Sequence, residues 1–577
     1  MTLWLFLLPL KFGSMAVMPE IGGFYPASWT DYIYTSLPAH SLGIVGAIML
    51  LLALCVKSSA CSADLRKLIY VWAILPVLAA LPGAINGYFD ESLGEIANLA
   101  GMGCFMAAAA ILGNGDEKNT KYFSAALLLG GLTAAGYGIY QYFYGLDELR
   151  RFAMEQYSQG IILSDAIKLK LTDTRVFSTM ASSNTFASLL LMTTFPVLFF
   201  AWKWSRRIDP PGITWGFFLL IAAGLIIPAM YFSGSRGIIF SLLCAAFMAA
   251  LSAPGWKKQL KIIVFSALMI AALGIFIYLF YCGRSIASMG ERADYIRSSA
   301  IMTLQKPFAG NGWGSFFRIH SQIKLSFVGE SARDPHNVVA AFAGQCGVFS
   351  GLGILFSLLY PLYKLYRYRF SKTLQGAVFW SGAVFFIHSL IDCDWHVPAL
   401  PAAMGIWFAL AIDTAENTEV SNAWKNKKEL FFRIFATFLA ITSIILNGYV
   451  LKGDHALSRL QERLSPQSAE SAAQIRHLSV EKVFQNAFIY RSKSAVVHII
   501  RGDYFRSQQN WLQAEKSYLE ALKIDPLRPG IYLRLAKLAQ VQNKSGEVEA
   551  FLLKAHQLAP RNPKYSLEKL RSEVEKL

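Results

Sequence analysis

Several basic side chains and one imidazole stand at the ends of long apolar segments. Residues 331–351, SARDPHNVVAAFAGQCGVFSG, carry Arg333, Asp334 and His336 up to the start of such a segment. Arginine forks bind phosphate and diphosphate oxygens in bidentate fashion, and a neutral imidazole accepts a proton from an attacking hydroxyl. A diphosphate held by arginines can leave without a metal ion. The other cations at segment ends are Arg175, Arg236, Arg292 and Arg297.

The elements that must position these residues are membrane helices. The chain has 577 residues, of which 54% are hydrophobic and only 16% are charged. Soluble proteins are about 25% charged. Apolar blocks of about 18–25 residues are long enough to cross a bilayer as helix. We predict an all-α, polytopic bundle of about thirteen spans, at 1–18, 39–56, 67–85, 95–113, 122–144, 183–203, 214–231, 236–252, 260–281, 337–362, 374–392, 397–414 and 431–451.

The distribution of positive charge predicts the orientation of this bundle. A net charge of +17 would suggest nucleic acid as a partner of a soluble protein, but cytoplasmic loops of membrane proteins collect Lys and Arg. Six alternate loops are basic, so we place them in the cytoplasm. The loops at about 145–182 and 282–336 then lie outside, together with the candidate cations. The seven cysteines form no CxxC pair, so we expect neither a disulfide framework nor a zinc site of the usual spacing.

The last part of the chain, 452–577, is charged and repeats itself. Pro526 and Pro560 are 34 residues apart, as are Ala521 and Ala555. A helix–turn–helix period of this length resembles tetratricopeptide repeats. We place the repeats outside the cytoplasm. They could bind peptides or partner proteins, or form a cap or scaffold over the membrane domain.

The ordered motifs of residues 170–412 resemble the O-antigen ligase superfamily. These motifs are RVFSTMASSNTFASLLL, SGSRGIIFSLL, ERADYIRSSAIMTLQKPFAGNGWGSF, DPHNVVAAFAGQCGVFSGLG and HSLIDCDWHVPALPAAMGIWF. The superfamily comprises O-antigen ligases, some polysaccharide polymerases and protein O-oligosaccharyltransferases of bacteria. The resemblance implies a helical domain in the bacterial inner membrane. Its activity would be metal-independent, inverting transfer of a glycan from an undecaprenyl-diphosphate carrier to an acceptor hydroxyl, without a cofactor.

The resemblance also implies roles for individual residues. His336 matches the proposed catalytic base, and Arg236 in SGSRG matches a diphosphate-binding arginine. Arg292 matches another, with Arg297 as the alternative, and Arg175 is a further candidate. The GNGWGSF turn matches a glycine-rich segment whose backbone we expect to approach the ligand.

Three regions follow from these observations: N-terminal membrane helices at 1–170, a ligase-like domain at 171–451 with its large outer loop at 282–336, and the repeats at 452–577. Ligases of the superfamily end soon after their last membrane helix, so the added repeats leave the acceptor open between lipid, growing polysaccharide and protein. The partners we expect are the lipid-linked donor, that acceptor, membrane lipids and a protein bound by the repeats, with no nucleic acid.

Three other interpretations use the same residues differently. His388, Asp392, Asp394 and His396 could bind a metal ion, although we predict no metal site. A transporter or flippase of lipid-linked sugars would show inverted repeats with broken helices, and the two halves of the membrane region show no such repeat. A non-catalytic assembly protein would use only the repeats.

Overall fold

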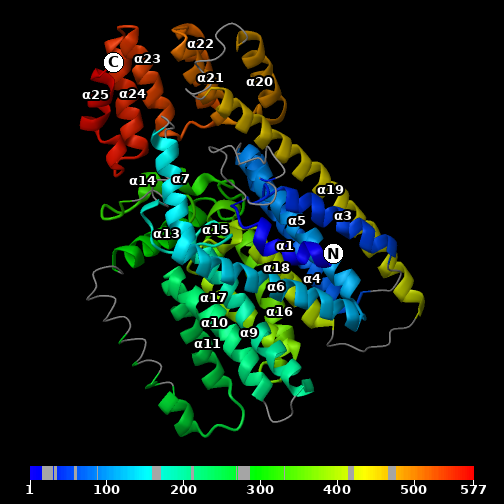
Figure 1. Cartoon of the computed structure of the whole chain (residues 1–577). Coiled ribbons are helices and arrows are strands. Elements are labelled where there is room, and N and C mark those ends of the chain that lie inside the picture. Colours follow the sequence, from blue (N-terminus) through cyan, green and yellow to red (C-terminus); the bar gives the residue numbers. More distant parts are fainter. Residues whose placement is uncertain are drawn as a thin grey trace.

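The computed structural model describes residues 1–15, 30, 35–56, 61–86, 89–158, 171–208, 213–264, 266–267, 270, 274, 286–329, 332–413, 422–464 and 476–576. Every regular element among these residues is a helix, which confirms the predicted all-helical fold. Figure 1 shows a large bundle with a smaller group of helices, α20–α25, stacked at one end of it.

The helices of the bundle are long and apolar. Six of them have the length and composition of membrane spans: Ala63–Asn86, Ser92–Gly113, Glu117–Glu155, Ser183–Arg206, Val348–Tyr368 and Lys427–Gln461. Shorter apolar helices cover Thr2–Lys11, Ser41–Val56, Leu219–Ser233, Arg236–Ser252 and Ala399–Ile412. These helices indicate a membrane protein. The count of thirteen spans stays a prediction, and most of the span predicted at 260–281 lies outside the described residues.

The bundle is built around two of its most buried helices. The first half of the bundle contains α1 (Thr2–Lys11), α3 (Ser41–Val56), α4 (Ala63–Asn86), α5 (Phe89–Gly113), α6 (Glu117–Tyr140), η1 (Gln141–Gly145), α7 (Leu146–Ser158), α9 (Ser183–Ile208), α10 (Ile213–Ser233) and α11 (Arg236–Ser252). The second half contains α13 (Ile286–Gln305), α14 (Ser315–Ile323), α15 (Val338–Cys346), α16 (Val348–Leu365), η2 (Tyr366–Tyr368), α17 (Leu374–Ser389), η3 (Asp394–His396), α18 (Ala399–Asp413) and α19 (Asn422–Arg463). One continuous core, to which α5 and α18 contribute many fully buried residues, runs from Leu5 of α1 to Ala440 of α19. Most of these helices share this core, whereas α11 packs on α9 and α17 in a smaller cluster and α13 and α14 pack on each other in another.

The single helix predicted at 337–362 is wrong, because the structure divides it into α15 and α16 at Gly347. This glycine has φ +87°, a conformation that side chains other than glycine rarely adopt. A Cβ atom there would lie 2.9 Å from the carbonyl oxygens of Pro307 and Phe308. The close approach of the 307–308 backbone therefore requires both the glycine and the break. As a result, α15 forms a separate short helix that starts at the candidate base.

The C-terminal helical unit, residues 476–576, is a row of antiparallel helices. It contains α20 (Arg476–Arg491), α21 (Ala495–Ser507), α22 (Trp511–Ile524), α23 (Pro529–Val541), α24 (Ser545–Leu558), η5 (Pro563–Tyr565) and α25 (Leu567–Glu575). The starts of α21 and α23, Ala495 and Pro529, are 34 residues apart. The long helix α19 leads from the bundle into this unit (Figure 1). Arg491 anchors the unit to the start of α5, donating to Asp90 at 2.8 Å.

Candidate functional site

The local fold holds His336 in an unusual backbone conformation at the start of α15. Its φ is +53°, and its N–H donates to Asp334 Oδ1 at 2.8 Å. The next residue, Asn337, caps α15 by accepting the Ala340 N–H at 2.9 Å and donates to the Leu390 carbonyl at 2.9 Å. Left-handed residues other than glycine cost free energy and cluster at functional sites. The DPHN segment is therefore pinned against the end of α17 with its imidazole fixed.

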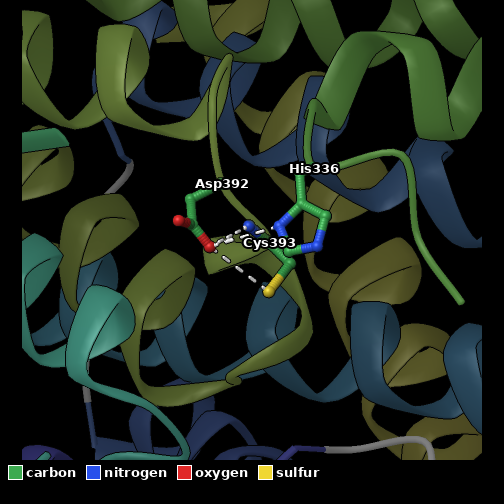
Figure 2. A group of neighbouring side chains, drawn as sticks. All are labelled: His336, Asp392 and Cys393. Atoms are coloured by element: carbon green, nitrogen blue, oxygen red, sulfur yellow. Dashed lines mark hydrogen bonds and ion pairs between the residues drawn. The ribbon is translucent and has the colours of Figure 1, made fainter. Parts of the chain in front are cut away.

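A buried carboxylate joins His336 to one of the candidate arginines. Asp392, 4% exposed, lies in the turn after α17, with Oδ1 3.6 Å from His336 Nδ1. Its Oδ2 accepts from Asn184 Nδ2 at 2.6 Å and from Arg292 Nη2 at 3.4 Å. Figure 2 shows the imidazole and the carboxylate facing each other, with Cys393 beside them. Three separate segments of the chain, which carry His336, Asn184 and Arg292, therefore converge on Asp392.

The charges in this group tune one another. Burial opposes protonation of His336, but the interaction with Asp392 and the charge of Asp334 outweigh it and raise the pKa of the imidazole. Burial likewise opposes ionisation of Asp392, but His336, His388 and Arg292 hold the pKa of this carboxyl below its usual range. Asp392 is therefore ionised. Nδ1 is the ring nitrogen that faces it, at 3.6 Å, so a neutral imidazole with its hydrogen on Nδ1 suits this carboxylate and leaves Nε2 to accept a proton.

Arg175 lies at the same end of the bundle. Its guanidinium pairs with Asp173 at 2.7 Å, and the interactions with Asp173 and the charge of Asp392 raise the pKa of the guanidinium, against burial. A Cβ atom on Gly234, in the SGSRG turn, would lie 2.9 Å from Arg175 Cδ, so the turn packs directly on this side chain. The π-helical turn η1 supports the segment, because Gln141 Oε1 accepts the N–H of Phe177 at 2.9 Å.

Arg236 is the first residue of α11 and is exposed. An arginine at a helix N-terminus is unfavourable for the helix dipole, whereas an anion there is favourable. The following residue, Gly237, packs against the end of α17: a Cβ atom would lie 2.7 Å from His388 Nε2 and 3.4 Å from Ile391 Cδ1. Because Ile391 directly precedes Asp392, the start of α11 lies beside the turn that carries this carboxylate.

The structure separates the two alternative arginines of α13. Arg292 contacts Asp392, whereas Arg297 donates to Asp294 Oδ1 at 3.0 Å and to the Ile323 carbonyl at 3.1 Å. Arg297 therefore holds α13 to the end of α14. Arg333 is exposed and directly precedes Asp334. The structure thus brings Arg175, Arg236, Arg292 and His336 to one end of the bundle and gives Arg297 a packing contact.

The glycines of the GNGWGSF turn permit a close approach to α15. The N–H groups of Asn311 and Gly312 both donate to the Gln345 carbonyl at 2.8 Å, and Gly314 N–H donates to Gln345 Oε1 at 2.7 Å. A Cβ atom on Gly310, whose φ is +61°, would lie 2.6 Å from the Gln345 carbonyl oxygen. These glycines allow the backbone of the turn to pack closely on α15, and the expected approach to a ligand stays a prediction.

The four residues of the metal interpretation do not gather around one point, because only His388 and Asp394 contact each other. His388 Nδ1 lies 2.7 Å from Asp394 Oδ2, both fully buried, and His396 Nε2 lies 2.7 Å from Asp334 Oδ2. Asp392 interacts with His336 instead.

A different trio has its ligand atoms within 4.8 Å of one another: His336, Asp392 and Cys393. Burial and the charge of Asp392 raise the pKa of the Cys393 thiol well above its usual value, and a neutral thiol is a poor ligand. The Arg292 guanidinium, 3.4 Å from Asp392, also repels a cation. The neutral thiol and the neighbouring guanidinium make this trio a weak candidate for a metal site.

Sequence reasoning missed the side chains that orient His336. Asp392 was considered only as a metal ligand, and Tyr295, whose ring stacks on the imidazole at 5.8 Å between centroids, was not considered. Burial lowers the pKa of His396, but Asp334 and Glu95 raise it to about 9. The protonated imidazole of His396 therefore forms an ion pair with Asp334, whose other oxygen accepts the His336 N–H. Because Asn184 and Asp392 are 208 positions apart, no local spacing could have revealed these contacts.

Comparison with protein-family models and with curated proteins found no match for the chain. The resemblance to the O-antigen ligase superfamily therefore rests on the motifs of residues 170–412 alone.

Proposed function

We propose that the chain is a membrane glycosyltransferase that moves a glycan from an undecaprenyl-diphosphate carrier to an acceptor hydroxyl. The observation that carries the proposal is the contact of His336 with the ionised Asp392, which also contacts Arg292. This reaction needs a general base for the acceptor hydroxyl and cations that stabilise the departing diphosphate. His336, oriented by Asp392, and the neighbouring arginines are suited to these two roles. The site would face outward from a bacterial inner membrane, as the basic loops on the opposite side predict.

In the proposed reaction, His336 Nε2 accepts the proton of the acceptor hydroxyl while its oxygen attacks the anomeric carbon of the donor sugar. The bond from that carbon to the diphosphate oxygen breaks, and undecaprenyl diphosphate leaves from the opposite face, which inverts the configuration. Asp392 stabilises the imidazolium that forms, and Arg175, Arg236 and Arg292 neutralise the charge that develops on the leaving group. No metal ion enters the scheme.

The same chemistry serves a ligase, a polymerase and a protein O-oligosaccharyltransferase, which differ only in the acceptor. In this proposal the C-terminal helical unit acts as tetratricopeptide-like repeats, and a surface formed by them would recruit a protein acceptor or partner. A transporter or an assembly scaffold would need neither an oriented imidazole nor an acceptor hydroxyl.

The test uses the purified full chain in lipid nanodiscs with an undecaprenyl-diphosphate-linked glycan and candidate lipid, glycan and peptide acceptors. The proposal expects release of undecaprenyl diphosphate together with a modified acceptor, and loss of both in His336→Ala. Arg236→Ala should raise the KM for the donor. Full transfer by a folded His336→Ala variant would refute the assignment of the base. In proteoliposomes, movement of the donor from one leaflet to the other without transfer of its glycan would favour the transporter instead.

A further inference from the structure

A buried ion pair joins the C-terminal helical unit to the loop that carries the candidate base. Arg318 of α14 donates from Nε to both oxygens of Asp525 at 2.8 Å, and from Nη2 to Oδ2 at 2.6 Å. The two side chains are only 8% and 1% exposed. Such a bidentate pair fixes both distance and angle, because moving either partner leaves a buried charge without its counter-charge.

A second contact holds the C-terminal end of the same helix. Arg561 Nη1 donates to the carbonyl of Lys324, the residue that follows α14. Asp525 and Arg561 belong to the turns that follow α22 and α24, two successive hairpins of the C-terminal unit. Arg318 and Lys324 are six positions apart, which corresponds to a rise of about 9 Å along a helix. Consecutive turns of the unit therefore hold the middle and the C-terminal end of α14, which lies directly below the unit in Figure 1.

From α14, packed rings lead to the imidazole of His336. His320 is fully buried in α14, stacks on Phe316 at 5.2 Å and meets the Tyr295 ring edge-on at 5.1 Å. Tyr295, 3% exposed, stacks on His336 with an interplanar angle of 25°. Since protein interiors are close-packed, a shift of α14 must displace Tyr295 and with it the imidazole.

We propose that Arg318 and Asp525 are positioning residues, which clamp the C-terminal unit onto α14 and so fix the ring stack behind His336. The unit is then a structural part of the site as well as any surface for partners. The consequence for glycan transfer rests on the proposed function. The mechanical coupling between Asp525 and the 286–329 segment does not, since it follows from the contacts alone.

The experiment measures hydrogen–deuterium exchange of the full chain in nanodiscs, in the peptides that cover α13 and α14. Asp525→Asn should raise exchange in α14 at least tenfold, because the neutral side chain removes the charge that pairs with the buried guanidinium of Arg318. The matched control is Asp503→Asn, which breaks an ion pair with Arg534 inside the unit, about one third exposed on both sides. The control should leave α14 unchanged. The paired substitution Arg318→Met with Asp525→Leu, which removes both charges, should restore most of the protection.

Transfer kinetics then separate the two proposals. Asp525→Asn should lower kcat at least fivefold and change the KM for the donor by a smaller factor, because Arg175 and Arg236 lie outside α13 and α14. If the unaltered chain transfers no glycan, the proposed function fails while the exchange result still decides on the clamp. Equal exchange in Asp525→Asn and Asp503→Asn would overturn the clamp. Loosened α14 with an unchanged kcat would overturn the positioning role. If Asp525→Asn does not fold, Arg318→Lys, which keeps the charge but loses the fork, is measured in the same way.

Discussion

Replacing Asp392 by asparagine tests the core of the proposed site, because it removes one charge and keeps the shape of the side chain. At the observed 3.6 Å between His336 Nδ1 and Asp392 Oδ1, an effective dielectric constant of about 20 gives about 5 kcal/mol of attraction once the imidazole is protonated. His336 is 31% exposed and Arg292 opposes the attraction, so we expect roughly 3–4 kcal/mol to be lost from the transition state. That loss corresponds to a fall in kcat of roughly 10²–10³-fold.

The assay is steady-state transfer from the undecaprenyl-diphosphate-linked donor, with kcat and KM determined separately between pH 5.5 and 9. Because Asp392 raises the pKa of His336, the acid limb of the rate profile should move to lower pH in Asp392→Asn. The KM for the donor should stay the same or fall, since a negative charge beside the diphosphate has been removed.

The matched control for this substitution is Asp64→Asn. Asp64 is another buried carboxylate, 5% exposed, which accepts from Tyr360 at 3.2 Å and pairs with Lys364. It stands among the residues predicted at the cytoplasmic end, so its replacement should disturb packing but not catalysis. An Asp392→Asn variant that keeps both the wild-type kcat and the wild-type pH profile would refute the imidazole–carboxylate reasoning.

Three further predictions concern stability and metal. Asp334 and Glu95 raise the pKa of His396 to about 9 against the effect of burial. Protonated His396 therefore adds about 3 kcal/mol to the free energy of unfolding below pH 6.5, and this stabilisation is lost as the pH rises through about 9. Thermal unfolding in detergent from pH 6 to 10 should show this loss, and His396→Asn should abolish it; an unchanged slope would contradict the assignment. Gly347→Ala should lower the melting temperature, because of φ +87° and the crowding carbonyls, whereas Gly136→Ala, in open space on α6, should not. Equal effects of the two would count against the strained break between α15 and α16. Prolonged EDTA treatment should leave the transfer rate within about twofold; loss of activity that zinc restores would instead identify His336, Asp392 and Cys393 as ligands.

The helical nature of the chain could be predicted because apolar blocks of span length dominate the composition. Pro526 and Pro560, 34 residues apart, lie in the turns that follow α22 and α24, and the assignment to tetratricopeptide repeats stays a prediction. The break at Gly347 could not be predicted. The residues around it read as one apolar run, and its cause is the tertiary approach of Pro307 and Phe308.

The site was predictable in its residue types but not in its pairings. Arg236, Arg292 and His336 stand out because cations and an imidazole border apolar helices. The choice between Arg292 and Arg297 required the fold, since both lie on α13 and only the position of Asp392, 100 residues from Arg292, distinguishes them. The clamp between Arg318 and Asp525 joins residues 207 positions apart, so it was likewise inaccessible to local patterns.

The central claim is that this end of the bundle binds the diphosphate of a lipid carrier, and direct binding of undecaprenyl diphosphate to the full chain in nanodiscs tests it. We expect effects of opposite sign at two residues that contact each other, Arg292 and Asp392. Arg292→Ala should weaken binding at least tenfold, whereas Asp392→Asn should leave it unchanged or tighten it. Unchanged binding in Arg292→Ala, or equal weakening in both variants, would contradict the claim.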